Sequence, residues 1–253
     1  MARALLLLLL GCASCATPGS SLSAGRDAYP LQVELEAGAL WQSRNDVRIP
    51  NAGGTRFSIE ELSGDDEYPI ARLTADWDLD PRHALRFVLA PLELDGTGEL
   101  EGPTVFAGET FAAGTPTDAS YRFNSYRVGY RYTFLHDERW RLRVGGTLFV
   151  RDAEIELVQG ATRASDSDVG VVPLLAFAAE YYPAQRWSLI AELDGLASSQ
   201  GRAFDFTARA RYDLTDTASL GLAYRTIEGG ADTDEVYSFA WLHSVVATFA
   251  LRF

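Results

Sequence analysis

Apolar and polar residues alternate along most of the chain from residue 31 to its end. From 204 to 214, for example, the even positions hold Phe, Phe, Ala, Ala, Tyr and Leu, whereas the odd positions hold Asp, Thr, Arg, Arg and Asp. A period of two places successive side chains on opposite faces of a β-strand. Ten such segments occur, at 31–42, 72–79, 85–89, 126–134, 140–151, 171–182, 187–194, 204–214, 220–225 and 237–253. We therefore predict an all-β fold.

The connections between these segments alternate in length. Short ones fall at 80–83, 135–138, 183–186 and 215–218, and longer ones at 44–67, 101–119, 158–168, 196–202 and 229–235. Short turns on one side and long loops on the other are typical of outer-membrane barrels. We predict a transmembrane antiparallel up-and-down β-barrel of about ten strands over 30–253, with both termini in the periplasm. Pro91 and Pro173 predict bulged or locally unpaired strands.

A soluble β-sandwich would also alternate, but three features favour the barrel. The segments approach the length that a tilted strand needs to cross a bilayer. The face opposite the apolar one carries charges of both signs, which suits an enclosed polar interior. Aromatic residues gather at the ends of the segments in two belts, as at two membrane interfaces. One belt holds Trp77, Phe134, Trp140, Tyr181, Trp187 and Tyr212, and the other Trp41, Tyr237, Phe239 and Trp241.

The first 16 residues have the pattern of a signal segment. Arg3 precedes a run of leucines at 5–10, a short positive region followed by a short apolar one. Two processing routes remain open. Cys12 in Leu-Leu-Gly-Cys fits a lipidation site, whereas the small residues before Ala16 fit ordinary cleavage after it. Residues 17–27 are small and polar, and we expect a flexible leader over 17–29.

The charge and the cysteines exclude several classes of function. A net charge of −13 argues against binding nucleic acid, which needs a basic surface. Cys12 and Cys15 are the two cysteines, so the predicted barrel contains neither a disulfide nor a cysteine-based zinc site. The acidic stretch at 229–235 lacks the ligand spacing of a calcium loop. We expect no cofactor and no metal, and the expected partners are outer-membrane lipids and lipopolysaccharide.

The last nine residues, VVATFALRF, alternate and end on an aromatic residue. They resemble the terminal signal of outer-membrane proteins, and this resemblance implies recognition of Phe249, Leu251 and Phe253 by the barrel-assembly machinery. Three further stretches, SRNDVRIP (43–50), RDAEIEL (151–157) and EGGADTDEVYSFAW (228–241), resemble barrel proteins of Gram-negative bacteria. The resemblance implies a bacterial outer-membrane fold and no particular activity.

The predicted inward face carries a nearly balanced set of charges. Buried charges need partners, so we expect a network of ion pairs that plugs a narrow interior. A small pore with charge-dependent selectivity is the alternative. The charges that we expect to form this network are Arg72, Arg127, Arg131, Arg141, Arg143, Arg209, Arg211, Asp76, Glu180, Glu192 and Asp205, joined by further inward charges such as Arg86, Arg225, Asp194 and Asp213.

An enzyme is the third hypothesis. The chain resembles outer-membrane proteases in strand number, and their chemistry uses Asp and His at the outer rim. His83 and His136 lie in the short turns. His243 lies two positions from Trp241 and from Val245, so its side chain should face the lipid as theirs do. Lipid A deacylases place a His and a Ser on the lipid face, but Ser244 follows His243 directly and points the other way. We therefore expect no catalysis, and we predict a structural or surface-interaction role with a charge-plugged interior.

Overall fold

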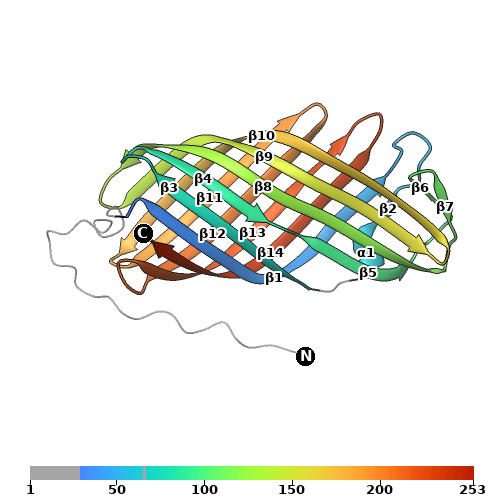
Figure 1. Cartoon of the computed structure of the whole chain (residues 1–253), viewed down its shortest axis with the longest axis horizontal. Coiled ribbons are helices and arrows are strands. Elements are labelled where there is room, and N and C mark those ends of the chain that lie inside the picture. The colour runs from blue at the N-terminus through green and yellow to red at the C-terminus, as the bar shows by residue number, and fades with distance from the viewer. Residues whose placement is uncertain (1–28, 65–66) are drawn as a thin grey trace.

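Ten antiparallel strands close into a barrel in the computed structural model, which describes residues 29–64 and 67–253 (Figure 1). The predicted signal segment at 1–16, Cys12 and nearly all of the leader at 17–29 lie outside the described residues. The barrel strands are β1 (Leu31–Arg48), β3 (Tyr68–Asp78), β4 (His83–Ala90) with its continuation β5 (Glu93–Glu99), β8 (Pro116–His136), β9 (Trp140–Gln159), β10 (Thr162–Ala184), β11 (Trp187–Ser198), β12 (Gly201–Asp213), β13 (Ala218–Asp232) and β14 (Tyr237–Arg252). Each pairs with the next, and β14 pairs with β1 to complete the ring, which confirms the predicted barrel.

The two ends of the barrel differ. At what we call the terminal end, Leu31 and Phe253 exchange backbone hydrogen bonds of 3.3 and 2.8 Å, and the strands are joined by the predicted short turns. The opposite, loop end carries β2 (Phe57–Ser58), α1 (Ile59–Ser63), β6 (Thr104–Phe106) and β7 (Glu109–Phe111), as the right side of Figure 1 shows. The first and last strands therefore begin and finish on the same side of the barrel.

The lengths predicted for three loops at the loop end are wrong. Instead of the loops at 158–168, 196–202 and 229–235, the strands continue to tight turns at 160–161, 199–200 and 233–236. The long connections predicted at 44–67 and 101–119 are present, but they contain short strands and a helix. The strands β1, β8, β9 and β10, with 18 to 23 residues each, extend well past the 9–11 residues that a tilted strand needs to cross a bilayer.

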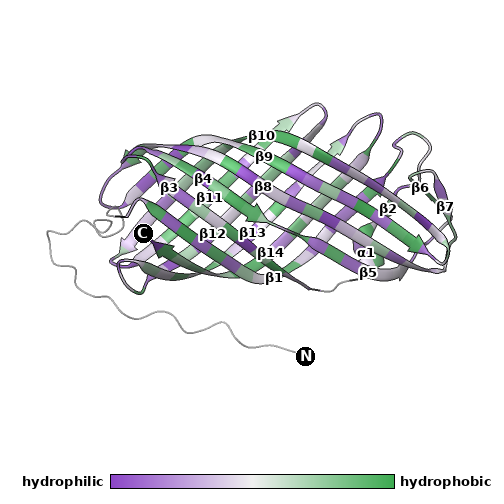
Figure 2. Cartoon of the chain, viewed as in Figure 1, coloured by the Kyte–Doolittle hydropathy of each residue, from purple (hydrophilic) through white to green (hydrophobic). Residues whose placement is uncertain are grey.

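The apolar residues face outward in the terminal half of a strand and inward in its loop half. In the terminal half of β9, Val144 and Leu148 face outward and are about half exposed, whereas Arg143 and Thr147 face inward and are buried. In its loop half, Ile155 and Leu157 point inward and are buried, while Glu154 and Glu156 face outward. Figure 2 shows the alternation along the strands. The terminal half thus has the apolar wall of a membrane barrel, and the loop half has the apolar interior of a soluble one.

The short helix α1 fills the interior at the loop end. The Ser58 side chain accepts a hydrogen bond from the backbone N–H of Glu61 and caps the helix. On β5, a Cβ at Gly98 would lie 2.6 Å from the carbonyl oxygen of Leu62, and one at Gly96 would lie 2.3 Å from the Cα of Ser63. The helix backbone therefore packs directly on glycine backbone. None of the helices in the described ranges is both long and apolar enough to pass through a bilayer.

Pro91 and Pro173 lie at places where strand pairing stops. Pro91 lies in the break between β4 and β5. Pro173 pairs with Leu148 of β9, but on its other side the pairing of β10 with β11 goes no farther than Leu175–Gly195. Proline lacks the backbone N–H that donates to a neighbouring strand, which explains why both residues lie where strand pairing is interrupted.

Candidate functional site

All of the charged residues predicted for the interior lie inside the barrel. Together with neighbours on the same faces they form a set of ten arginines and nine carboxylates. The set is Arg72, Arg86, Arg127, Arg131, Arg141, Arg143, Arg209, Arg211, Arg225 and Arg252, with Glu34, Glu36, Asp76, Asp78, Glu180, Glu192, Asp194, Asp205 and Asp213. Arg252 was not among the predicted inward residues, although its position between Leu251 and Phe253 gives it that orientation.

Carboxylates from two strands hold arginines from opposite sides of the interior. Asp205 on β12 lies 2.8 Å from the guanidinium of Arg127 on β8, and 3.4 Å from those of Arg72 and Arg225. Glu36 on β1 lies 2.6 Å from Arg209 and 2.9 Å from Arg225. Arg225 therefore bridges the two carboxylates, and the pairs form one connected network.

A second group of pairs continues this network toward β4. Arg86 lies 2.7 Å from Asp76 on the neighbouring strand and 2.6 Å from Glu192 across the interior. Arg131 reaches Asp194 at 2.8 Å. A guanidinium can satisfy a carboxylate through two donors in a fixed geometry. The arrangement therefore neutralises the interior charges against one another.

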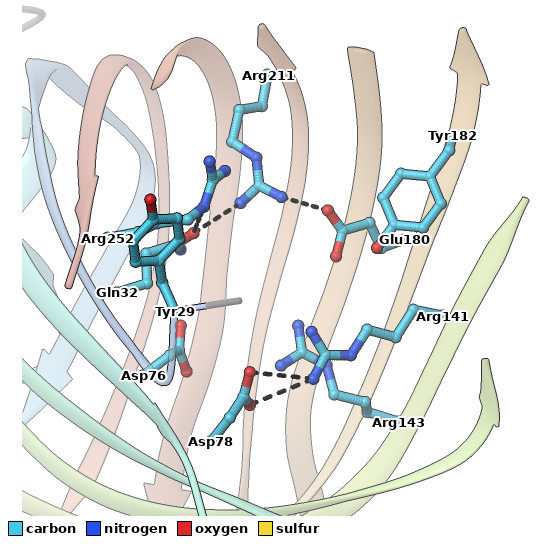
Figure 3. Close-up of a pocket in the computed structure, with 10 residues that line it drawn as sticks. All are labelled: Tyr29, Gln32, Asp76, Asp78, Arg141, Arg143, Glu180, Tyr182, Arg211 and Arg252. Carbon is cyan, nitrogen blue, oxygen red and sulfur yellow. Dashed lines mark hydrogen bonds and ion pairs between the residues drawn. The ribbon is translucent and has the colours of Figure 1, made fainter. Parts of the chain in front are cut away.

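A small cavity of about 50 Å³ opens at the terminal end (Figure 3). Arg141 binds Asp78 there at 3.2 Å, and Arg211 binds Glu180. Arg143 is buried and lines the same cavity, yet it forms no ion pair with any residue in the described ranges. The cavity has room for a few water molecules.

The loop half of the interior is closed by apolar side chains. Residues of α1 pack there with residues of the surrounding strands. The buried cluster includes Leu40, Val47, Ile59, Leu62, Leu94, Phe106, Phe111, Tyr121, Leu157 and Leu242. The barrel is thus filled by two layers, one apolar at the loop end and one of paired charges in the rest.

On the outer wall, the structure places a serine beside His243. The outward orientation predicted for His243 is correct, and its neighbour Ser244 is buried inside. A serine on the same face as His243 comes from β1 instead of from position 244. Ser43 Oγ lies 2.9 Å from His243 Nε2, and the hydroxyl of Tyr224 on β13 lies 2.7 Å from Nδ1.

Basic and aromatic side chains cover the outer wall on the loop side of this serine. Arg44 and Arg202 lie over the ring of Phe239, at 5.5 and 5.2 Å from its centroid. Arg48 and Arg56 lie over the ring of Tyr237, at 5.5 and 5.0 Å. We call these six residues, Arg44, Arg48, Arg56, Arg202, Tyr237 and Phe239, the basic–aromatic patch.

The arginines of the patch outnumber the carboxylates that pair with them. Asp46 pairs with Arg44 and Arg56, both at 2.6 Å, and Glu228 pairs with Arg202. The four arginines thus meet two carboxylates, and Arg48 bonds to the Asn51 side chain instead. The pattern of residues along a single strand does not reveal the patch, because its residues are spread over three strands and a loop.

The wall below the patch is apolar. Large apolar side chains on it are 40–60% exposed, among them Leu73, Phe87, Val128, Leu148 and Leu222. The predicted assembly-signal residues Phe249, Leu251 and Phe253 also face outward. An apolar surface that encircles a closed barrel is suited to lipid, because exposing it to water is costly.

Comparisons with solved structures agree with this fold. The outer-membrane protease OmpT of Escherichia coli superimposes with a TM-score of 0.55 at 10% identity, over 88% of this chain and 96% of that one. Ail of Yersinia pestis, in complex with the heparin analogue sucrose octasulfate, gives a TM-score of 0.37 at 10% identity, over 87% and 99%. The toluene transporter TodX of P. putida gives 0.36 at 10%, over 92% of each chain. No family model matches the sequence, and neither does any curated protein. The chain is therefore an integral β-barrel with the fold of bacterial outer-membrane proteins.

Proposed function

We propose that this protein is a closed outer-membrane barrel with a structural or surface-interaction role, and that its working surface is its outer wall. The observation that carries this proposal is the filling of the interior. The loop half is occupied by α1 and an apolar cluster, and the rest by arginines paired with carboxylates. Neither layer offers a hydrated path.

The alternative, a narrow channel, requires interior charges that are available to a passing ion. Here the charges engage each other, often with two or three partners each. The Asp205 side chain is 6% exposed and that of Arg127 is 3% exposed. An ion would have to displace these pairs and then pass the apolar cluster around α1.

We propose that the loop end faces the outside of the cell and that both termini face the periplasm. Short turns lie at the terminal end, and the structured connections lie at the loop end. Short periplasmic turns and longer external connections are the usual arrangement in bacterial outer-membrane barrels.

The partners that we propose are the anionic lipids of the outer leaflet, including lipopolysaccharide. The basic–aromatic patch lies just beyond the apolar wall, at the level that we assign to the lipid headgroups. Its arginines are accessible, since the side chains of Arg44, Arg56 and Arg202 are 34%, 52% and 45% exposed. A guanidinium can bind a phosphate through two parallel hydrogen bonds.

Osmotic swelling of vesicles that contain the refolded protein tests the closed interior. We expect vesicles with this protein to exclude small sugars and salts as well as vesicles without it do. Swelling that depends on the protein and on solute size would overturn the closed barrel and support the channel.

Titration with lipopolysaccharide in neutral detergent tests the lipid partner. Each arginine near an anionic surface contributes about 1 kcal/mol, so we expect Arg48→Gln with Arg202→Gln to weaken binding by about 30-fold. Arg163→Gln is the matched control, because Arg163 is exposed on the loop half and pairs with Glu156 outside the patch. Equal affinity in the double variant and the control would contradict the proposed partner.

A further inference from the structure

A bulge in β1 brings Ser43 to His243. The pairing of β1 with β14 shifts register between Gln42 and Arg44, which leaves Ser43 as the extra residue. Such a bulge re-aims a side chain that the regular ladder would not place there. Ser43 Oγ thereby lies 2.9 Å from His243 Nε2, across the seam where the first and last strands close the barrel.

The other ring nitrogen of His243 is also engaged. The hydroxyl of Tyr224 lies 2.7 Å from Nδ1. With the ring proton on Nδ1, His243 donates to the Tyr224 oxygen, and its Nε2 lone pair accepts the Ser43 hydroxyl proton. A serine bonded to a histidine whose second nitrogen is oriented by a third group is the arrangement of an activated nucleophile.

The rings around this pair fix the imidazole. The ring of Trp41 on β1 stacks on that of His243 with centroids 5.6 Å apart, and Trp241, two residues before His243 on β14, lies 5.2 Å away. Trp241 is itself anchored, since its indole N–H donates to Thr226 Oγ1 at 2.8 Å. Rigid neighbours preserve the hydrogen-bond geometry that catalysis by a serine and a histidine needs.

The pair also lies about one membrane crossing away from the terminal end of the barrel. His243 is ten positions before Phe253 on the last strand, and a tilted strand crosses the apolar layer in about 9–11 residues. Below the pair, Val245 and Phe249 face outward and are 43% and 40% exposed. Above it, Arg44 begins the basic–aromatic patch. A lipid with its anionic headgroup on the patch would present its ester bonds at the level of Ser43.

We propose that Ser43 and His243 hydrolyse a fatty acyl ester of an anionic lipid in the outer leaflet. This inference rests on the proposed binding of such lipids to the patch. Ser43 Oγ attacks the ester carbonyl carbon while His243 Nε2 takes the hydroxyl proton. The carbon–oxygen bond to the lipid alcohol then breaks, and His243 returns the proton to that alcohol.

Water completes the reaction. His243 removes a proton from a water molecule, whose oxygen attacks the acyl group on Ser43. The bond to Ser43 breaks, a free fatty acid leaves, and the proton held by His243 returns to the Ser43 oxygen. The products are one fatty acid and one lipid that has lost an acyl chain, and no oxidant or cofactor takes part.

The experiment uses the refolded full-length protein in vesicles that contain either lipopolysaccharide or phosphatidylglycerol. Free fatty acid and the mass of the remaining lipid are measured for both. We expect release from at least one of these lipids, and the two arms show which lipid is the substrate. Ser43→Ala and His243→Ala should each reduce release by at least 100-fold, in line with the loss of a nucleophile or a general base. Ser244→Ala is the control, because Ser244 follows His243 directly but lies inside the barrel.

A phosphonate probe that reacts with activated serines gives an independent readout. We expect it to label the wild type at Ser43 and to leave both Ser43→Ala and His243→Ala unlabelled. Tyr224 is a positioning residue, so Tyr224→Phe should lower kcat and leave KM unchanged. If the wild type binds lipopolysaccharide but neither releases fatty acid nor reacts with the probe, the catalytic inference fails and the proposed function stands. If it does not bind, the proposed function fails as well.

Discussion

The Asp205 carboxylate and the Arg127 guanidinium meet 2.8 Å apart inside the barrel, although they come from strands on different sides of it. Asp205 also faces Arg72 and Arg225, and Arg127 stacks on Phe149 with its guanidinium carbon 4.8 Å from the ring centroid. Burial makes such a pair costly to break, because a lone charge remains in a medium that solvates it poorly. The pair therefore ties β8 to β12 across the interior.

The change Asp205→Ala should lower the free energy of unfolding by about 3–5 kcal/mol, since it leaves buried arginines without their carboxylate. Urea unfolding of the refolded barrel in lipid vesicles measures this effect. The control is Glu156→Ala, which removes an exposed pair with Arg163 and should cost no more than about 1 kcal/mol. Equal costs for the two variants would show that the interior network does not stabilise the fold.

The free energy of unfolding should fall less in Arg143→Met than in Arg131→Met. Arg143 is a buried cation with no ion pair among the described residues, whereas Arg131 is paired with Asp194. Arg143 acts on Asp76 and Glu192 through its charge without contacting them, so its replacement by an apolar chain of similar length should cost less stability than the loss of a direct ion pair. Replacing Arg131 leaves Asp194 with a weaker partner and should cost more. The same urea experiment compares them, and a larger loss at Arg143 would contradict this assignment.

The change Gly98→Ala should loosen α1. The added Cβ would meet the carbonyl oxygen of Leu62 at 2.6 Å and its Cα at 2.7 Å, so the helix must move. We expect a cost of about 1–3 kcal/mol and faster hydrogen exchange of the α1 amides. Gly102→Ala is the matched control, because a Cβ there meets no atom within 4 Å. Unchanged exchange in Gly98→Ala would show that the helix is not held by this contact.

One pH effect is expected at the turn between β8 and β9. The backbone N–H groups of Arg139 and Trp140 both donate to the Asp137 carboxylate at 2.8 Å, and they hold its pKa below the usual value. A lowered pKa in the folded state stabilises the protein above the unfolded pKa of about 3.9, and this stability is lost as the pH falls through the folded value. The stability difference between wild type and Asp137→Ala should therefore shrink below about pH 4. A difference that stays constant down to pH 2 would contradict this prediction.

The alternation of residues predicts the membrane half of this barrel well and the other half poorly. In the terminal half, apolar positions face lipid and charged positions face inward, so parity alone identifies the inward arginines. In the loop half the sense is reversed: Ile155 and Leu157 fill the interior, and Glu154 and Glu156 face outward. A search for strands with an apolar outer face therefore ends them too early. Three of the five stretches predicted as long loops, at 158–168, 196–202 and 229–235, are therefore largely continuations of strands.

The site on the outer wall illustrates a different limit. The spacing of residues along β14 correctly gives the orientation of His243, and it correctly places Ser244 on the opposite face. It contains nothing about Ser43, which is 200 positions away and reaches His243 through one register shift. Pairing of the first strand with the last could have been expected for a closed barrel. The position of a one-residue bulge in that pairing could not.

Single-channel recording of the refolded wild-type protein in planar bilayers tests the closed barrel most directly. The apolar layer around α1 and the paired charges below it should block ions, so we predict no steady conductance at any voltage that the bilayer withstands. Detection of steady conductance steps, with an ion selectivity that changes in Arg127→Gln, would contradict this account and show that the interior is a channel.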